Sequence, residues 1–184
     1  MEILITDIPE EGLQLHFEEA TESWFQQILS DALGDFYREG EEGDASFELY
    51  RTGENVNCMG QVCCSAHPTC SRCLKVFEIT LEVPIHLNLA PLFDVEVPAK
   101  TSKKEEVELV KEDLDFAFYE EGKFNLGDLI HEQVILALPM QPVCNGDCKG
   151  LCQFCGNDLN EGSCGCEVKQ TDPRWNALKA LKRP

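Results

Sequence analysis

Six cysteines in the C-terminal part of the chain have the residue type and the spacing of a metal site. They lie in the segment CNGDCKGLCQFCGNDLNEGSCGC, at Cys144, Cys148, Cys152, Cys155, Cys164 and Cys166. Four thiolates give zinc a closed, tetrahedral site. The segment has few apolar side chains, so a bound metal is the natural source of its folding free energy. We therefore predict Zn²⁺ as the cofactor rather than a loop of free thiols.

Four of the six cysteines form the ligand set that we rank first: Cys152, Cys155, Cys164 and Cys166. Cys152-x-x-Cys155 is followed by Gly156, which relieves backbone crowding after a tight turn in which two sulfurs converge. Because a C-x-C pair chelates one metal less readily than C-x-x-C, Cys148 is an alternative to Cys164 or Cys166.

A second C-x-x-C, Cys70-Ser-Arg-Cys73, lies between two predicted strands. We favour two ordinary thiols at the end of a hairpin. The alternative is a second zinc site, which requires the fold to bring this pair to Cys144 and Cys148. His67 is a spare ligand in that alternative, although a plain loop histidine is the simpler interpretation. Three further cysteines are expected as small buried side chains of a strand: Cys58, Cys63 and Cys64.

The charge of the chain favours a basic partner. There are 34 acidic and 15 basic residues, a net charge of −19, and residues 1–50 hold 14 of the acids and one of the bases. Such a field repels phosphate backbones at long range. Direct RNA binding is therefore disfavoured, except through the C-terminal segment.

The elements that must position these residues predict an α+β fold: an antiparallel β-sheet with two amphipathic helices, and a C-terminal cysteine-rich zinc loop with a short helix. Helical periodicity covers residues 18–33 and 125–138. Strands are expected at 3–8, 13–17, 45–66 (as two strands around a turn at 53–55), 76–92 and within 107–119. Residues 97–106 form a polar excursion.

Two domains follow from the change in composition at Cys144: an α+β body over 1–143 with an acidic N-terminal part, and a zinc-binding module over 144–184. Asp172-Pro173 fits the start of the final helix. That helix carries a tryptophan and four basic residues: Trp175, Arg174, Lys179, Lys182 and Arg183. Asp172 is assigned to capping, while Arg174 and Trp175 are also candidates for a contact with RNA or protein.

Motifs of the common enzyme classes are missing, so we predict a protein that is not an enzyme and has no small-molecule substrate. There is no phosphate-binding glycine loop and no G-x-S-x-G elbow, and His131-Glu132 lacks the second histidine of a zinc protease helix. The sequence contains no apolar run of about 18 residues, so no transmembrane helix is predicted. The N-terminal residues do not resemble a signal peptide, so we expect a cytoplasmic location.

Four segments together resemble the YceD family, the large ribosomal RNA subunit accumulation proteins. They are CSRCL (70–74), NLGDLIHEQVILALPMQPVC (125–144), CKGLCQFCGNDLN (148–160) and DPRWNALKAL (172–181). The resemblance implies a role in accumulation of large-subunit ribosomal RNA, and hence in ribosome assembly. Members of this cysteine-rich type look like zinc-binding proteins, whereas others lack most of the C-terminal cysteines. The resemblance therefore implies a structural metal.

The resulting hypothesis is a non-enzymatic ribosome-assembly factor with a structural four-cysteine zinc site. Its acidic half would bind a basic ribosomal protein or a pre-ribosomal particle, while the cysteine module and the basic helix make a separate contact. The acidic surface could instead serve only solubility. Two other functions stay open: a thiol redox or zinc-sensing protein that uses Cys70/Cys73 or Cys152/Cys155, and an RNA-binding zinc module.

Overall fold

The computed structural model describes residues 1–92 and 116–166, and the chain divides into two compact units. The first, which we call the body, comprises Met1–Pro68 and Val76–Met140. The second, the cysteine module, comprises Thr69–Lys75 and Gln141–Pro184. The sequence-based boundary at 143/144 placed residues 69–75 in the body, whereas the structure groups them with the module.

The body is built on a five-stranded sheet in the order β2-β3-β4-β5-β6. Its strands are β2 (Leu13–Glu18), β3 (Asp44–Thr52), β4 (Asn55–Ala66), β5 (Ile79–Pro91) and β6 (Phe116–Tyr119). All neighbours are antiparallel except β5 and β6, which run parallel. A separate two-stranded antiparallel sheet pairs β1 (Glu2–Leu4) with β7 (Lys123–Asn125). The predicted α+β class is confirmed.

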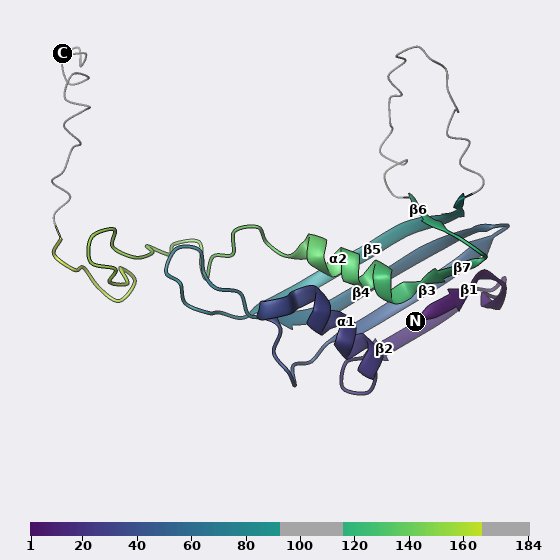
Figure 1. Ribbon diagram of the computed structural model, residues 1–184, viewed down its shortest axis with the longest axis horizontal. Helices are drawn as coiled ribbons and strands as arrows, with labels where there is room; N and C mark the ends of the chain where they lie inside the picture. The colour runs from purple at the N-terminus through teal and green to yellow at the C-terminus, as the bar shows by residue number, and fades with distance from the viewer. Residues whose placement is uncertain (93–115, 167–184) are drawn as a thin grey trace, which may run out of the picture. The chain divides into compact units, whose positions relative to one another are not determined.

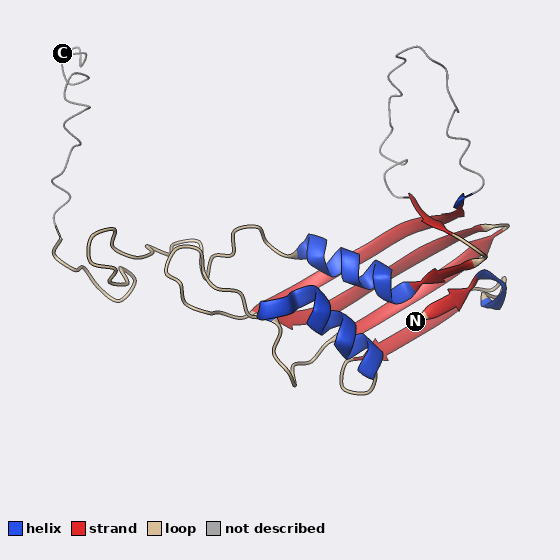
Figure 2. Cartoon of the chain, viewed as in Figure 1, coloured by secondary structure: helices blue, strands red, loops and turns tan. Residues whose placement is uncertain are grey.

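Two helices, α1 (Ser23–Leu33) and α2 (Leu126–Ala137), lie over one face of the five-stranded sheet (Figures 1 and 2). Short 3₁₀ turns follow β1 at Ile5–Asp7 and follow α1 at Gly34–Phe36. The Asn125 side chain caps α2, because its Oδ1 accepts a hydrogen bond from the Gly127 N–H at 3.0 Å. Each helix buries one apolar stripe against the sheet, as its periodicity predicted.

The core lies between the helices and the inward face of the sheet. Its largest fully buried side chains come from both layers: Phe25, Leu29, Phe47, Leu49, Val56, Val62, Ile85, Leu89, Leu126, Ile130 and Val134. Gly60 lies opposite Phe47 in the β3–β4 pairing, and a Cβ at Gly60 would collide with the Phe47 ring. A residue without a side chain is therefore needed for Phe47 to pack.

Several predicted boundaries shift in the structure. The helix expected from residue 18 begins at Ser23, because Glu18 completes β2 in register with Asp44. The strand expected over 3–8 is short and turns into the first 3₁₀ segment after Leu4. Residues 97–106 and the C-terminal helix, with Asp172, Arg174, Trp175, Lys179, Lys182 and Arg183, lie outside the described residues. Within the described part of the chain, no helix has the length and apolar character needed to span a membrane.

Candidate metal centres

Eight cysteines of the module converge into two groups of four. We call Cys70, Cys73, Cys144 and Cys148 the buried cluster, and Cys152, Cys155, Cys164 and Cys166 the exposed cluster. Within each cluster all four sulfurs lie within 4.8 Å of one another. The exposed cluster is the ligand set that the sequence ranked first, and the buried cluster is the second site left as an alternative. Cys148 belongs to the buried cluster rather than replacing Cys164 or Cys166.

The sulfur geometry of the buried cluster fits a tetrahedral zinc ion. The Cys70 and Cys148 sulfurs are 3.9 Å apart, and those of Cys73 and Cys144 are 3.7 Å apart. Four Zn–S bonds of about 2.3 Å give a tetrahedron whose sulfurs are about 3.8 Å apart. A disulfide would require about 2.05 Å, and every cysteine is a free thiol. The donor set and its spacing therefore suit zinc.

Hydrogen bonds fasten the two segments that supply the buried cluster. The backbone N–H and the hydroxyl of Ser71 both donate to the Pro142 carbonyl, at 2.8 and 2.9 Å. The Arg72 guanidinium donates to the carbonyls of Gly146 and Cys148, at 3.3 and 3.0 Å. The Leu151 N–H donates to the Arg72 carbonyl at 3.1 Å. Thr69–Lys75 is thereby held against the later segment although about 70 residues separate them in sequence.

The exposed cluster is built on the predicted knuckle. The Gly156 N–H donates to the Cys152 carbonyl at 2.9 Å, and the Phe154 N–H lies 3.5 Å from the Cys152 sulfur. Gly156 has a φ of 75°, a conformation that glycine adopts readily. Cys152 is buried, whereas Cys155 and Cys166 are exposed. This cluster is therefore the more accessible of the two.

The sulfurs within each cluster differ in their affinity for a proton. Burial alone would raise the pKa of Cys70, but backbone N–H groups directed at its sulfur lower that pKa to about 6. Backbone N–H groups likewise lower the pKa of Cys152 to about 6. Burial and neighbouring thiols raise the pKa of Cys144 to about 12. Thiols packed this closely oppose one another's ionisation, and a divalent cation removes that conflict.

Other candidate ligands lie away from both clusters. The His67 Nε2 is 2.9 Å from the Glu41 carboxylate within the body, so His67 is a partnered loop histidine. Cys58 and Cys64 are buried on the inward side of β4, and Cys63 lies half-buried on its other side. His131 and Glu132 lie on α2, and the described residues contain no third ligand group beside them. These positions agree with the simpler interpretation of His67, Cys58 and Cys64, whereas Cys63 was expected to be buried and is only half-buried.

Two residues that sequence reasoning did not single out organise the module. The Lys75 ammonium lies 2.8 Å from Asp158 Oδ2 and 2.7 Å from Glu161 Oε1. The Asn160 side-chain amide lies 3.4 Å from the Cys148 sulfur, towards which it donates. Lys75 and Glu161 are 86 residues apart in the sequence, so spacing gave no signal for their contact. Asn160 is not a residue type that marks a metal site, so residue type gave no signal for it.

Comparison with known proteins connects this region to a family. A model described as large ribosomal RNA subunit accumulation protein YceD matches residues 59–182, which contain all eight cysteines of the two clusters. Uncharacterized proteins of Mycobacterium bovis and Mycobacterium tuberculosis are each 30% identical over 141 residues, 77% of this chain and 62% of the relative. The chain thus spans about three fifths of the length of these curated relatives. No solved structure matches it.

Proposed function

The chain belongs to the YceD family of large ribosomal RNA subunit accumulation proteins, and we propose that it is a non-enzymatic assembly factor for the large ribosomal subunit. Membership suggests a ribosome-related role. The family match across both cysteine clusters carries the proposal, and the charge and metal chemistry below give it a mechanism. In this mechanism the protein binds a basic ribosomal protein and keeps it available for assembly, without performing a reaction.

In this proposal each cluster holds one structural zinc ion. A zinc ion with four cysteine ligands has no open coordination position for water or substrate, so it stabilises a fold rather than activating a nucleophile. Among the described residues of the cysteine module, the buried hydrophobic side chains are all cysteines: Cys70, Cys73, Cys148 and Cys152. The apolar core of the described chain lies in the body. Metal binding would supply the folding free energy that this unit lacks.

Charge separates the two units sharply. The body carries 29 acidic and 7 basic residues, a net charge of −22, and the module carries 5 acidic and 8 basic residues. A zinc ion held by four thiolates has a net charge of about −2. Two such ions would cancel the module's excess of three positive charges. A fully loaded protein would thus lack a net positive unit, which favours a basic protein over RNA as the partner.

The face of the five-stranded sheet opposite α1 and α2, which no helix of the described residues covers, is the surface we propose for that partner. One row across four strands pairs Glu18 with Asp44, Asp44 with Cys63, and Cys63 with Glu82. The three carboxylates of this row are exposed. Strands β2, β3, β4 and β5 contain one arginine and no lysine, and that arginine, Arg51, donates to the Ile5 carbonyl at 3.2 Å. The His16 imidazole lies 3.8 Å from the Glu18 carboxylate, and no lysine or arginine of these four strands pairs with the row. Lysine and arginine side chains of a partner would neutralise it.

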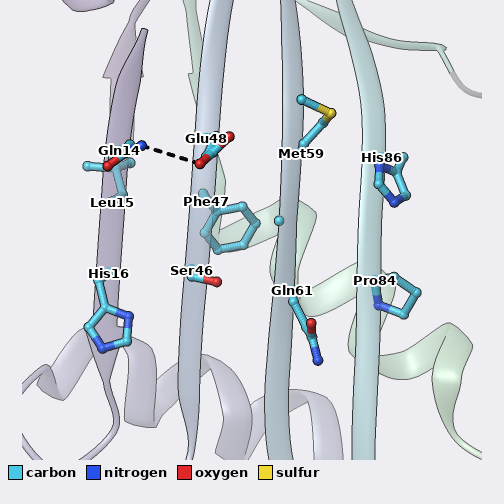
Figure 3. Close-up of a pocket in the computed structure, with 11 residues that line it drawn as sticks. Gln14, Leu15, His16, Ser46, Phe47, Glu48, Met59, Gln61, Pro84 and His86 are labelled. Atoms are coloured by element: carbon cyan, nitrogen blue, oxygen red, sulfur yellow. Dashed lines mark hydrogen bonds between the residues drawn. The ribbon is translucent and has the colours of Figure 1, made fainter.

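Next to this row the sheet face has a shallow hollow lined by groups that form hydrogen bonds. Figure 3 shows side chains from four neighbouring strands around it, including Gln14, His16, Ser46, Gln61 and His86. The Gln14 amide donates to the Glu48 carboxylate at 3.3 Å. Amide, hydroxyl and imidazole groups of this kind suit the polar backbone of an extended basic peptide.

The solvent accessibility of the exposed cluster favours a second candidate function, zinc sensing or thiol redox chemistry. Cys155 and Cys166 of the exposed cluster are accessible to solvent, and accessible thiolates are the ones that oxidants attack first. A zinc-sensing or redox protein would use this cluster. Such a protein would release zinc and form disulfides under mild oxidation, with no dependence on a ribosomal partner.

The test is binding of the full-length, zinc-loaded protein to a panel of purified large-subunit ribosomal proteins and to a large-subunit ribosomal RNA transcript. We expect one or more basic proteins to bind, and the affinity to fall steeply as salt rises from about 0.05 to 0.5 M. The triple variant Glu18→Gln/Asp44→Asn/Glu82→Gln should bind at least about tenfold more weakly. A matched control removes the same number of charges elsewhere: Asp31→Asn, Asp35→Asn and Glu39→Gln. Equal weakening by both triple variants, salt-insensitive binding, or binding of the RNA alone would contradict the proposal.

A further inference from the structure

The loop between the two ligand pairs of the exposed cluster is fastened to the buried cluster. We propose that Asn160, in this loop, couples the two metal centres, so that metal in the buried cluster strengthens metal binding by the exposed cluster. The inference rests on the proposed function in that it assumes metal binding by both clusters. Asn160 is a positioning residue here, since it contacts a ligand sulfur and no metal.

Both the nitrogen and the oxygen of the Asn160 side-chain amide form hydrogen bonds. Its Nδ2 lies 3.4 Å from the Cys148 sulfur and 2.7 Å from Asp158 Oδ1, and it can donate to both. Its Oδ1 accepts a hydrogen bond from the Lys149 N–H at 2.8 Å. The Asn160 backbone N–H donates to Asp158 Oδ1, also at 2.8 Å. One side chain therefore joins a ligand of the buried cluster, the chain beside that ligand, and the loop of the exposed cluster.

The position of this loop determines where the second ligand pair of the exposed cluster can lie. Asn160 stands between Cys155 and Cys164 in the sequence. Two further backbone hydrogen bonds dock the same loop: Leu159 N–H to the Gly150 carbonyl at 2.9 Å, and Cys152 N–H to the Asn157 carbonyl at 2.8 Å. A docked loop has lost its freedom before the exposed cluster binds metal, so that binding carries a smaller entropic cost.

Metal in the buried cluster strengthens the contact that docks the loop. A cysteine that holds a metal is a thiolate, and a hydrogen bond to an ionised acceptor is stronger than one to a neutral thiol. The Asn160–Cys148 contact therefore tightens once the buried cluster is loaded. By linkage the effect is reciprocal, because metal in the exposed cluster must then strengthen binding at the buried cluster by the same factor.

Asn145 provides a matched control. Its side-chain Nδ2 lies 3.8 Å from the sulfur of Cys144, so it also donates towards a ligand of the buried cluster. Asn145 precedes Cys148 and lies outside the loop of the exposed cluster. Asn160→Ala and Asn145→Ala each remove one amide from a thiolate of the same cluster, and Asn160→Ala alone also releases the loop.

The experiment is a titration of the full-length, reduced apoprotein with Co²⁺, followed by thiolate-to-cobalt absorption. Alkylation and mass spectrometry at each point report which cysteines the metal protects, cluster by cluster. We expect the exposed cluster of Asn160→Ala to bind Co²⁺ at least about fivefold more weakly than that of the unchanged protein. Asn145→Ala should leave the exposed cluster unchanged. Both variants keep all eight ligands, so this comparison does not depend on a damaged cluster.

A second comparison separates coupling from a local role of Asn160 in the loop. In Cys70→Ser/Cys73→Ser the buried cluster cannot load, and the exposed cluster should weaken by a similar factor. Adding Asn160→Ala to that variant should then weaken the exposed cluster by a smaller factor than the same substitution does in the unchanged protein, because only the contacts with Lys149 and Asp158 are left to lose. An equal factor in both backgrounds, or equal exposed-cluster affinity in Asn160→Ala and the unchanged protein, would overturn the coupling and leave the two metal sites standing. Failure of the unchanged protein to bind Co²⁺ at either cluster would overturn both the coupling and the metal-binding proposal.

Discussion

Leu74 and Gly156 occupy the same position in two equivalent knuckles, and both have a left-handed backbone. Each follows the second cysteine of a C-x-x-C pair, and their φ angles are 61° and 75°. Each N–H donates to the carbonyl of the first cysteine, of Cys70 and of Cys152, at 2.9 Å in both knuckles. Glycine adopts this conformation freely, whereas a leucine in it costs about 1–2 kcal/mol. The buried cluster therefore carries a local backbone strain that the exposed cluster lacks.

Leu74→Gly should stabilise the folded, zinc-loaded protein. The Leu74 side chain is 63% exposed, so its removal sacrifices little packing. Relief of the left-handed strain raises the free energy of unfolding, and the greater freedom of glycine in the unfolded chain lowers it. The net gain is up to about 1 kcal/mol. Chemical denaturation of the loaded protein measures it. The control is Gly156→Ala, which introduces a side chain at the same position of the other knuckle and should destabilise by about 1 kcal/mol. A loss of stability in Leu74→Gly would show that the leucine side chain has a structural contact.

Lys75→Met should destabilise the cysteine module more than Glu161→Gln does. Lys75 pairs with two carboxylates, of which the Asp158 side chain is 10% exposed and that of Glu161 is 73% exposed. Asp158 Oδ2 is buried, and its pairing with the Lys75 ammonium at 2.8 Å is what offsets its desolvation. Glu161 is solvated and loses little. Hydrogen exchange of residues 149–161 compares the variants, and equal protection in both would contradict the assignment.

Periodicity predicted most of the longer elements of the body, because their apolar residues recur at strand or helix spacing, but it did not predict β7. Alternation placed the β3–β4 hairpin with its turn after Thr52, and the apolar stripe placed α2 to within a residue or two. The start of α1 was wrong because Glu18 has a strand partner, Asp44, that no local pattern reveals. The pairing of β2 with β3 therefore makes Glu18 part of a strand rather than of the helix.

The same distinction explains the metal centres. The exposed cluster was predictable because its four cysteines span 15 residues, Cys152 to Cys166. In the buried cluster Cys73 and Cys144 stand 71 residues apart, and their meeting depends on contacts such as Ser71 with Pro142. Asn160 gave no signal at all, since an asparagine in a glycine-rich loop ordinarily indicates a turn.

The stability of the body should fall as pH rises above about 9. Burial raises the pKa of Cys58 to about 11, and burial, with Glu19 and Cys63 nearby, raises that of Cys64 to about 12, from an ordinary value of 9.0. Between these values the unfolded chain loses protons that the folded chain retains, so ionisation favours unfolding. Each thiol contributes at most about 1.4 kcal/mol per pH unit to this decline. The slope should be smaller in Cys58→Ala/Cys64→Ala, measured by denaturation between pH 8 and 11. An unchanged slope would assign the decline to other groups.

Glu18→Gln should raise stability while it weakens partner binding. Glu18 lies directly opposite Asp44 on the uncovered sheet face, and like charges in that position are destabilising. Removing one of them should stabilise the protein by about 0.2–1 kcal/mol. Denaturation and binding to the basic ribosomal protein are measured on the same variant. A variant that gains stability and binds as before would assign the row to solubility alone.

The central claim is a ribosome-assembly factor whose second unit is folded around two zinc ions, and native mass spectrometry of the reduced, full-length protein tests it most directly. We predict two zinc ions per chain. Cys70→Ser and Cys152→Ser should each hold one, and Cys63→Ser, the control on the sheet, should hold two. A chain that carries no metal, with its clustered thiols paired as disulfides, would contradict the account and favour a redox protein.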